Sequence, residues 1–213
     1  MKTDDGGTVA RLIEQPQNAR SRRTGAALLQ ATRDVIDKHG FEALTMAAVA
    51  ERAGVSRRAV YLHFSTRTEL VTALYRSLGH TEDLAASLQA VWESRDAATA
   101  LQEWAHHIAR SHPRILATLH AVERARHTDP DAAELWATTL TNWHKGCRRL
   151  AQWLADEDCL APFWTVDTTA DMLSALMSLD LLDRLLTDRR WSRKRIADQY
   201  AILLRSTFVV DAK

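Results

Sequence analysis

Two short helical patterns on either side of a glycine constrain the fold of this chain more than any other feature of its sequence. The first pattern follows Thr45, a residue type that can cap a helix, and it ends at Gly54. Its apolar residues recur at the i, i+3, i+4, i+7 spacing of one helix face: Met46, Val49, Ala50 and Ala53. The spacing predicts a short helix that stops at a tight turn.

The second pattern begins after Ser56 and covers residues 57–63. Val60 and Phe64 fall on its inward side, which leaves three larger polar side chains outside: Arg57, Arg58 and Tyr61. Two short helices at a tight turn, the second presenting cations and small residues, are what insertion into the major groove of DNA requires. The segment from about Thr45 to Phe64 therefore predicts a helix-turn-helix.

The rest of the sequence also predicts helices. Only 7 Gly and 4 Pro interrupt the 213 residues, so the expected fold class is all-α. Pro113 predicts a helix break because the residue before a proline disfavours helical geometry, and Ser192 can cap the last helix. About nine helices are expected, at residues 22–38, 45–53, 57–63, 66–94, 96–112, 113–127, 130–157, 168–189 and 193–210.

Charge is distributed unevenly along the chain. Residues 1–80 hold 12 Lys and Arg against 8 Asp and Glu, a net charge of +4, whereas residues 81–213 hold 16 against 19, a net charge of −3. Binding to phosphates needs local positive charge rather than a basic protein as a whole. The asymmetry favours a nucleic-acid partner at the N-terminal end.

The stretch from Leu44 to Leu70 resembles the DNA-binding domain of the TetR (tetracycline repressor) family. The family pattern reads T-x-x-x-[IVL]-A-x-x-A-G-V-S-x-x-[TA]-[LV]-Y-x-[HY]-F-x-[ST]-[KR]-x-x-L. This chain supplies Thr45, Val49, Ala50, Ala53, Gly54, Val55, Ser56, Ala59, Val60, Tyr61, His63, Phe64, Thr66, Arg67 and Leu70. Residues 1–20 mix Gly, Pro, Gln and charged residues without a sustained period, which predicts a flexible N-terminal arm. The resemblance implies a three-helix DNA-binding domain over 21–67 and a helical ligand-binding and dimerisation domain over 68–213.

The same resemblance implies how the helix-turn-helix holds the DNA backbone. It assigns phosphate contacts to Tyr61, His63 and Arg67, with Ser56 assisting. Thr45 and Ala59 complete the expected DNA-binding surface.

Arg57 and Arg58 are the candidate base readers, because an arginine can donate two hydrogen bonds to guanine. The alternative is that both bind phosphates and add affinity without specificity. Some family members carry a base-reading arginine at the place of Ala47. Base reading is therefore expected to depend more on residues 57–63 and on the arm, where Arg22 and Arg23 can enter the minor groove.

The segment 168–189 is apolar on nearly every side, so it must be covered all round. By the family resemblance, one side meets the core of its own protomer and the other meets a second subunit. A monomer with a deeply buried helix is the alternative. The residues expected at the homodimer interface are Leu176, Leu179, Leu182, Leu186, Leu203 and Phe208.

The chain contains seven tryptophans, five of which fall on the middle helices. The stretch from Glu134 to Trp143 resembles the TetR subgroup that contains the mycobacterial ethionamide-resistance regulator, whose pocket is long, apolar and lined by aromatic residues. The resemblance implies a small, mostly apolar effector bounded by Trp104, Trp136, Trp143, Met177 and Asp180. These tryptophans can equally be core residues, and Asp180 can instead pair with Arg148 or Arg184 or lie exposed at a helix edge.

Other classes of protein are disfavoured. The histidines at 106, 107, 112, 120 and 144 lack the spacing of a metal site, and neither H-E-x-x-H nor Cys-x-x-Cys is present, so no metal and no cofactor is expected. The sequence has no Gly-rich phosphate loop and no G-x-S-x-G, so we do not expect an enzyme. Cys147 and Cys159 are expected to be reduced thiols, and the absence of a long apolar segment predicts a cytoplasmic protein without a membrane partner.

These observations predict a homodimeric transcriptional regulator. We expect a repressor that is released from a palindromic DNA operator by its effector. The alternatives are a helical ligand-binding protein with a vestigial DNA domain and an activator of the same fold.

Overall fold

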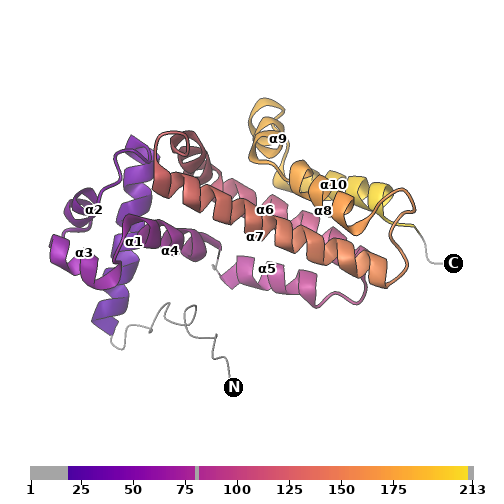
Figure 1. The fold of residues 1–213 in the computed structure, drawn as a ribbon, viewed down its shortest axis with the longest axis horizontal. Helices are drawn as coiled ribbons and strands as arrows, with labels where there is room; N and C mark the ends of the chain where they lie inside the picture. The colour runs from indigo at the N-terminus through magenta and orange to yellow at the C-terminus, as the bar shows by residue number, and fades with distance from the viewer. Residues whose placement is uncertain (1–18, 80–81, 211–213) are drawn as a thin grey trace, which may run out of the picture.

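The computed structural model describes residues 19–79 and 82–210, and it is built from helices (Figure 1). Within these residues no β-strand is present, and the extended pairing is limited to a single bridge between Leu160 and Val209. The all-α prediction is confirmed. The helices are α1 (Ala19–His39), α2 (Met46–Ala53), α3 (Arg57–His63), α4 (Arg67–Gly79), α5 (Glu82–Trp92), α6 (Ala97–Ala125), α7 (Pro130–Asp156), α8 (Val166–Leu176), α9 (Leu179–Asp183), the π-helical segment η1 (Arg184–Asp188) and α10 (Arg193–Phe208).

One hydrophobic cluster holds α1 to α4 together and joins them to α6 and α7. Leu28 of α1, Val49 of α2 and Val60 of α3 are completely buried in it, together with Leu70 of α4. Leu119 of α6 is buried in the same cluster. The helix-turn-helix therefore does not pack as an isolated unit, because its core continues into the long helices.

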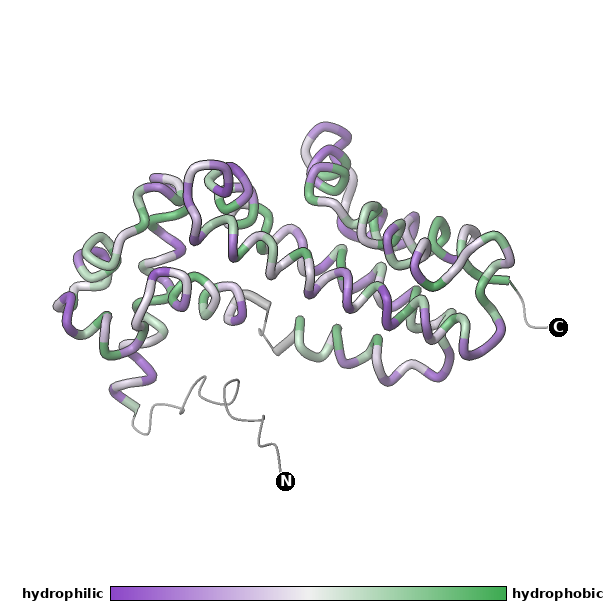
Figure 2. The backbone as a smooth tube through the Cα atoms, viewed as in Figure 1, coloured by the Kyte–Doolittle hydropathy of each residue, from purple (hydrophilic) through white to green (hydrophobic). Residues whose placement is uncertain are grey.

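A second hydrophobic cluster lies among α6, α7, α8 and α10. Ile108, Leu150, Leu173 and Leu204 bring one buried side chain from each of these helices into it. Figure 2 shows the apolar residues of the long helices alternating with polar ones along their length, as expected for helices with one covered face. α6 and α7 are thus shared by both clusters and form the axis of the molecule (Figure 1).

Three expected helix boundaries are corrected by the structure. α6 runs through Pro113 without ending, although an interior proline costs about 3 kcal/mol of helix stability. The buried residues on both sides of it, such as Ile108 and Leu119, supply enough packing to hold the helix continuous. The expected helix 66–94 is described as two helices, α4 and α5, with residues 80–81 between them outside the described part.

The third correction concerns the apolar segment 168–189, which is not one helix. α8 ends at Leu176, and the chain resumes as α9 and then the π-helical η1. The short connection places Met177 in the interior, at 2% exposure, next to the buried indole of Trp104. Packing of Met177 between the long helices therefore interrupts a segment whose sequence alone is compatible with continuous helix.

Among the described residues, no helix is both long enough and apolar enough to cross a membrane. Most of the expected N-terminal arm, residues 1–18, lies outside the described part. Ala19 and Arg20, which were expected in the arm, belong to α1.

Candidate nucleic-acid interface

The turn between α2 and α3 is built by local hydrogen bonds. The hydroxyl of Thr45 accepts a hydrogen bond from the backbone N–H of Ala48 at 3.0 Å and caps α2. Gly54 ends that helix in the left-handed conformation, with φ 66° and ψ 33°, which glycine adopts without the steric cost that a β-carbon brings. The Ser56 hydroxyl then accepts from the N–H of Ala59 at 3.2 Å and caps α3. These caps and the left-handed glycine fix where α2 ends and α3 begins, and so they hold the two helices at a fixed angle.

The outer face of α3 carries a compact set of exposed side chains. Val60 points inward and is fully buried, and so the residues on the opposite side of the helix face solvent. Arg57 and Arg58 are exposed in the first turn. One turn further on, Tyr61 and Leu62 are 48% and 77% exposed. The face thus combines two cations, a phenol and one apolar side chain, which suits base edges and phosphates in one groove.

Leu62 was missed by the sequence analysis. An apolar side chain on a short helix is normally assigned to the core, yet this one is among the most exposed large hydrophobic residues of the described chain. The sequence does hold a signal for its exposure. Leu62 comes four residues after Arg58 and so lies on the same side of the helix, away from the buried Val60. An exposed leucine on such a face can contact the methyl group of thymine.

The remaining motif residues of the segment are less accessible. Ala59 is half-buried, and the imidazole of His63 is half-buried near α1, where a β-carbon added at Gly25 would lie 3.8 Å from its Nδ1 atom. The hydroxyl groups of Thr45 and Ser56 are exposed while they cap their helices. Each hydroxyl oxygen already accepts the hydrogen bond that caps its helix, so a phosphate contact would use the hydroxyl as a donor at the same time.

Arg22 and Arg23 do not lie in an arm. Both are exposed in the first turns of α1, which begins at Ala19. The alanines and arginines around them are good helix formers, and the helix extends further toward the N-terminus than its apolar pattern indicates. A minor-groove contact by these two side chains would have to come from the end of a helix.

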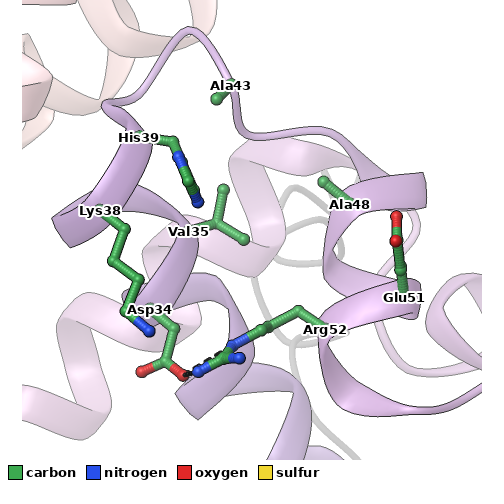
Figure 3. A pocket seen from close by; sticks show the side chains of 8 residues that line it. All are labelled: Asp34, Val35, Lys38, His39, Ala43, Ala48, Glu51 and Arg52. Carbon is green, nitrogen blue, oxygen red and sulfur yellow. Dashed lines mark hydrogen bonds and ion pairs between the residues drawn. The ribbon is translucent and has the colours of Figure 1, made fainter.

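An ion pair holds α2 against α1. The Arg52 guanidinium donates to Oδ2 of Asp34 from Nε at 2.9 Å and from Nη2 at 2.5 Å. Hydrogen bonds from Gln30 and Arg52 keep the pKa of the Asp34 carboxyl below its usual value. Figure 3 shows this pair beside an open hollow of about 500 Å³ between the two helices, lined by Asp34, Val35, Lys38, His39, Ala43, Ala48, Glu51 and Arg52. Its mixed charges and open shape suit a solvated groove rather than an effector cavity.

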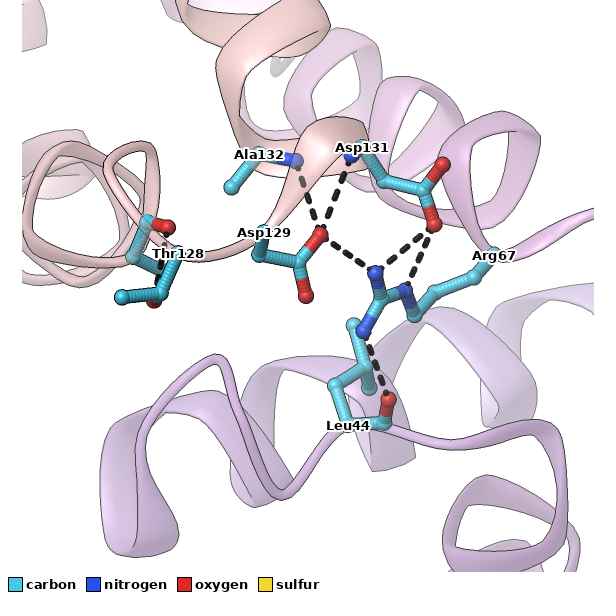
Figure 4. A network of polar contacts seen from close by, with 7 residues as sticks. Leu44, Arg67, Thr128, Asp129, Asp131 and Ala132 are labelled. Atoms are coloured by element: carbon cyan, nitrogen blue, oxygen red, sulfur yellow. Dashed lines mark hydrogen bonds and ion pairs between the residues drawn. The ribbon is translucent and has the colours of Figure 1, made fainter.

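Arg67 has protein partners instead of facing solvent. Its Nη2 lies 2.5 Å from Oδ1 of Asp129 and 2.7 Å from Oδ2 of Asp131, and its Nη1 donates to the carbonyl of Leu44 at 3.4 Å (Figure 4). The side chain is 22% exposed, and its guanidinium keeps the pKa of Asp131 below its usual value. In this conformation Arg67 ties α4 to the beginning of α7, and the phosphate contact implied by the family resemblance would require it to leave two carboxylates.

Three of the predicted effector residues are connected through His112. The indole N–H of Trp104 donates to the sulfur of Met177 at 3.0 Å, and Nε2 of His112 lies 3.1 Å from the Met177 carbonyl. The rings of His112 and Trp143 are 5.0 Å apart between centroids. Burial lowers the pKa of His112 from 6.5 to about 4, so the imidazole is neutral at pH 7. The interior is therefore apolar and aromatic, with a few polar atoms.

The other two predicted effector residues lie elsewhere. Trp136 belongs to the first cluster, at the end of the molecule near α1 to α4, where Arg126 stacks over its ring at 5.4 Å. Asp180 is exposed on α9, whereas Trp104 and Met177 are buried in the second cluster. Of the alternatives considered for Asp180, exposure at a helix edge is the one observed, and Arg148 pairs with Asp167 instead.

The residues expected at a dimer interface differ in their exposure. Leu179, Leu182 and Phe208 are buried inside the chain, at 4%, 1% and 0% exposure, so they have no apolar surface left for a partner. Leu176 and Leu186 are half-buried. Leu203 is 42% exposed, and it shares α10 with Ile202, which is 60% exposed and was not expected there.

Comparisons with known proteins agree with this geometry. The family model of bacterial regulatory proteins, tetR family, matches residues 28–74. The HTH-type transcriptional regulator TtgR of Pseudomonas putida is 41% identical to the chain over 63 residues, which are 30% of this chain and 30% of that protein. The chain thus matches less than a third of that relative's length.

Solved structures resemble the chain over most of its length. NalD, described as the secondary repressor of the MexAB-OprM multidrug efflux pump in Pseudomonas aeruginosa, has a TM-score of 0.69 and 22% identity, covering 91% of this chain and 100% of its own. A complex of SmeT with triclosan has a TM-score of 0.70 and 20% identity, covering 89% and 93%. These likenesses establish the fold, and the family match covers α2, α3 and parts of α1 and α4. Residues 28–74 are thus similar to the model of bacterial regulatory proteins of the tetR family, and the chain as a whole shares its fold with NalD.

Proposed function

We propose that this protein is a transcriptional regulator that binds a palindromic DNA operator through α2 and α3 and is released by a small, mostly apolar effector. The observation that carries the proposal is the outer face of α3, where Arg57, Arg58, Tyr61 and Leu62 are exposed on a helix fixed by its caps. Only a few side chains at the start of such a helix need to reach base edges. The role implies a cytoplasmic protein, because the operator lies there.

Effector binding is supported by the interior around Trp104 and Met177. The Nδ1 atom of His107, whose ring stacks on that of Trp104 with 5.8 Å between the centroids, is buried and has no hydrogen-bond partner among the described residues. Such atoms are costly unless something satisfies them, and a bound molecule with one or two polar groups can do so. The SmeT complex with triclosan, an aromatic molecule, is consistent with this chemistry. Assignment to the ethionamide-resistance subgroup remains a prediction.

Dimer formation is supported by apolar surface that the single chain leaves open. Ile202 and Leu203 of α10 are exposed, as are Leu181 of α9 and Met172 of α8. Two reading helices at one operator need a dimer with two-fold symmetry, because half-sites lie about one DNA turn apart. We propose that α8, α9 and α10 supply the interface.

The experiment is selection of duplexes from a random-sequence pool by the purified full chain at near-physiological salt. We expect an inverted repeat. If no sequence is enriched by folded protein that carries no copurified ligand, the chain is a helical ligand-binding protein with a vestigial DNA domain.

The effector step is tested on the selected operator. Triclosan serves as the first apolar probe, and operator affinity is measured at fixed salt over a range of its concentration. Release requires that the probe bind the two conformations with affinities that differ by about 1 to 3 kcal/mol. In-vitro transcription from a promoter that carries the operator distinguishes a repressor from an activator.

A further inference from the structure

Four metal-ligating side chains meet between α6 and α9, away from the DNA-reading face. His120 and Glu123 lie one turn apart on α6, and Asp180 and Asp183 lie one turn apart on α9. His120, Glu123 and Asp180 each offer one ligand atom, and the three atoms lie within 4.8 Å of one another. No metal was expected from the sequence, because the histidines lack the spacing of a metal site and neither H-E-x-x-H nor Cys-x-x-Cys is present. The two pairs described here are about 60 positions apart along the chain, so a search for local motifs does not find them.

The imidazole of His120 is held between carboxylates on both of its sides. Its Nδ1 lies 3.6 Å from Oε2 of Glu123, and its Nε2 lies 3.9 Å from Oδ2 of Asp183. Nε2 is buried and has no hydrogen-bond partner among the described residues. Both distances are too long for hydrogen bonds. The imidazole therefore has a carboxylate near each nitrogen but is hydrogen-bonded to neither of them.

The geometry points to a divalent transition-metal site of the Zn²⁺ class, with His120, Glu123 and Asp180 as its protein ligands. One imidazole nitrogen and two carboxylates are a ligand set that Zn²⁺ accepts, at ligand distances of about 2.0 to 2.2 Å. Ligand atoms around such an ion lie about 3.4 Å apart in a tetrahedron, so the observed group has to contract by roughly 1 Å. Asp180 is exposed and free to rotate inward.

Asp183 completes the arrangement as a supporting carboxylate. Its Oδ1 accepts a hydrogen bond from the Thr187 hydroxyl at 2.8 Å, which leaves Oδ2 facing the imidazole. Histidines that bind metals commonly donate their other ring N–H to a carboxylate, which fixes the ring orientation and makes the ligating nitrogen more basic. Among the side chains that the structure describes, no lysine or arginine forms an ion pair with these three carboxylates. A cation is the missing partner.

A bound ion would join α9 to α6. In the chain, α9 follows α8 after a two-residue connection, Met177 and Ser178, that belongs to neither helix. Leu179 and Leu182 already bury one side of α9, and the ion would add a polar tie between its exposed side and α6.

The test uses metal-free full-length chain, titrated with Zn²⁺ by calorimetry and with Co²⁺ by visible absorption. We expect one ion per chain. Asp180→Asn, at an exposed position, should weaken binding about tenfold or more without harming the fold, and His120→Gln should do the same. The matched control is Asp171→Asn, because Asp171 is also exposed and lies beside a histidine, with its Oδ1 3.8 Å from Nδ1 of His144.

Binding that is lost in Asp180→Asn and kept in Asp171→Asn supports the site, even if His120→Gln does not fold. Two results overturn it. One is a wild-type chain that binds neither ion at about 0.1 mM. The other is equal affinity of the wild type and Asp180→Asn, which would place the ion on other side chains. Neither result bears on DNA binding, which is measured separately.

Discussion

The guanidinium of Arg67, in the first turn of α4, lies 2.7 Å from the carboxylate of Asp131, in the first turn of α7. It also lies 2.5 Å from Asp129, the residue whose side chain caps α7. α4 follows α3 directly in the chain, and α7 carries Trp143, one of the residues expected to contact an effector. The contact is therefore a direct physical link between the proposed DNA-reading helices and the helix that would respond to an effector.

Replacing Arg67 should destabilise the protein. Arg67→Ala leaves the largely buried Asp129 without its cation, and we expect the free energy of unfolding to fall by about 1 to 3 kcal/mol, measured with urea. A double-mutant cycle with Asp131→Asn should give a coupling of about 1 kcal/mol. The control is Arg95→Ala, because the Arg95 side chain is 86% exposed and its ion pair with Asp96 contributes at most about 1 kcal/mol. An Arg67→Ala loss no larger than that of the control would mean that the link is not structural.

Two substitutions on α3 should separate base reading from phosphate binding. Arg57→Ala is expected to relax the preference at one operator base pair, by about 1 to 3 kcal/mol, with little change elsewhere. Tyr61→Ala should weaken binding to all sequences about equally, since a phosphate contact carries no sequence information. Affinities for a panel of single-base operator variants measure both. A uniform loss for Arg57→Ala would reassign this side chain to the backbone.

Stability should fall in mild acid because of two buried histidines. Burial lowers the pKa of His107 and of His112 from 6.5 to about 4, so the unfolded chain binds more protons between these values. The stabilisation is complete above about pH 6.5 and is lost as the pH falls toward 4, by up to about 1.4 kcal/mol per pH unit for each histidine. Urea unfolding at several pH values measures the slope. His107→Gln should reduce it, whereas His39→Gln, at an exposed position, should leave it unchanged.

Gly146 of α7 allows close approach of an indole. A β-carbon there would lie 3.0 Å from Cη2 of Trp104, whose ring is held by Met177. We expect Gly146→Ala to lower the free energy of unfolding by about 1 kcal/mol, because overpacking outweighs the gain in helix propensity. Gly25→Ala on α1 meets only an ordinary contact at 3.8 Å and should be neutral or stabilising. Stabilisation of both variants to the same extent would show that Trp104 moves freely.

The proposed dimer should depend on α10. Ile202→Glu places a charge on the exposed apolar face and should convert the dimer to monomer, as measured by sedimentation at micromolar concentration. Phe163→Glu is the control, since Phe163 is 94% exposed on the connection between α7 and α8. A dimer that survives the first substitution and not the second would place the interface elsewhere.

Local signals made the helix-turn-helix predictable from the sequence. The caps at Thr45 and Ser56, the left-handed Gly54 and the buried Val60 all act within one or two helical turns, so each can be recognised without knowing the rest of the fold. The all-α class followed in the same way from the scarcity of glycine and proline. Arg57, Arg58 and Tyr61 were placed outside for the same local reason, and they are exposed.

Contacts between distant segments were decided by the tertiary structure. Arg67 matches a phosphate-binding position, yet its partners come 62 and 64 residues later. Leu179 and Phe208 are as apolar as Leu203, and only the packing of α9 and α10 against α6 determines which of them remains exposed. Asp180 meets His120 because α9 folds back onto α6. Helix caps and turns depend on neighbours within one turn, whereas burial, ion pairing and ligand geometry depend on which helices meet, and that is determined by the packing of the whole chain.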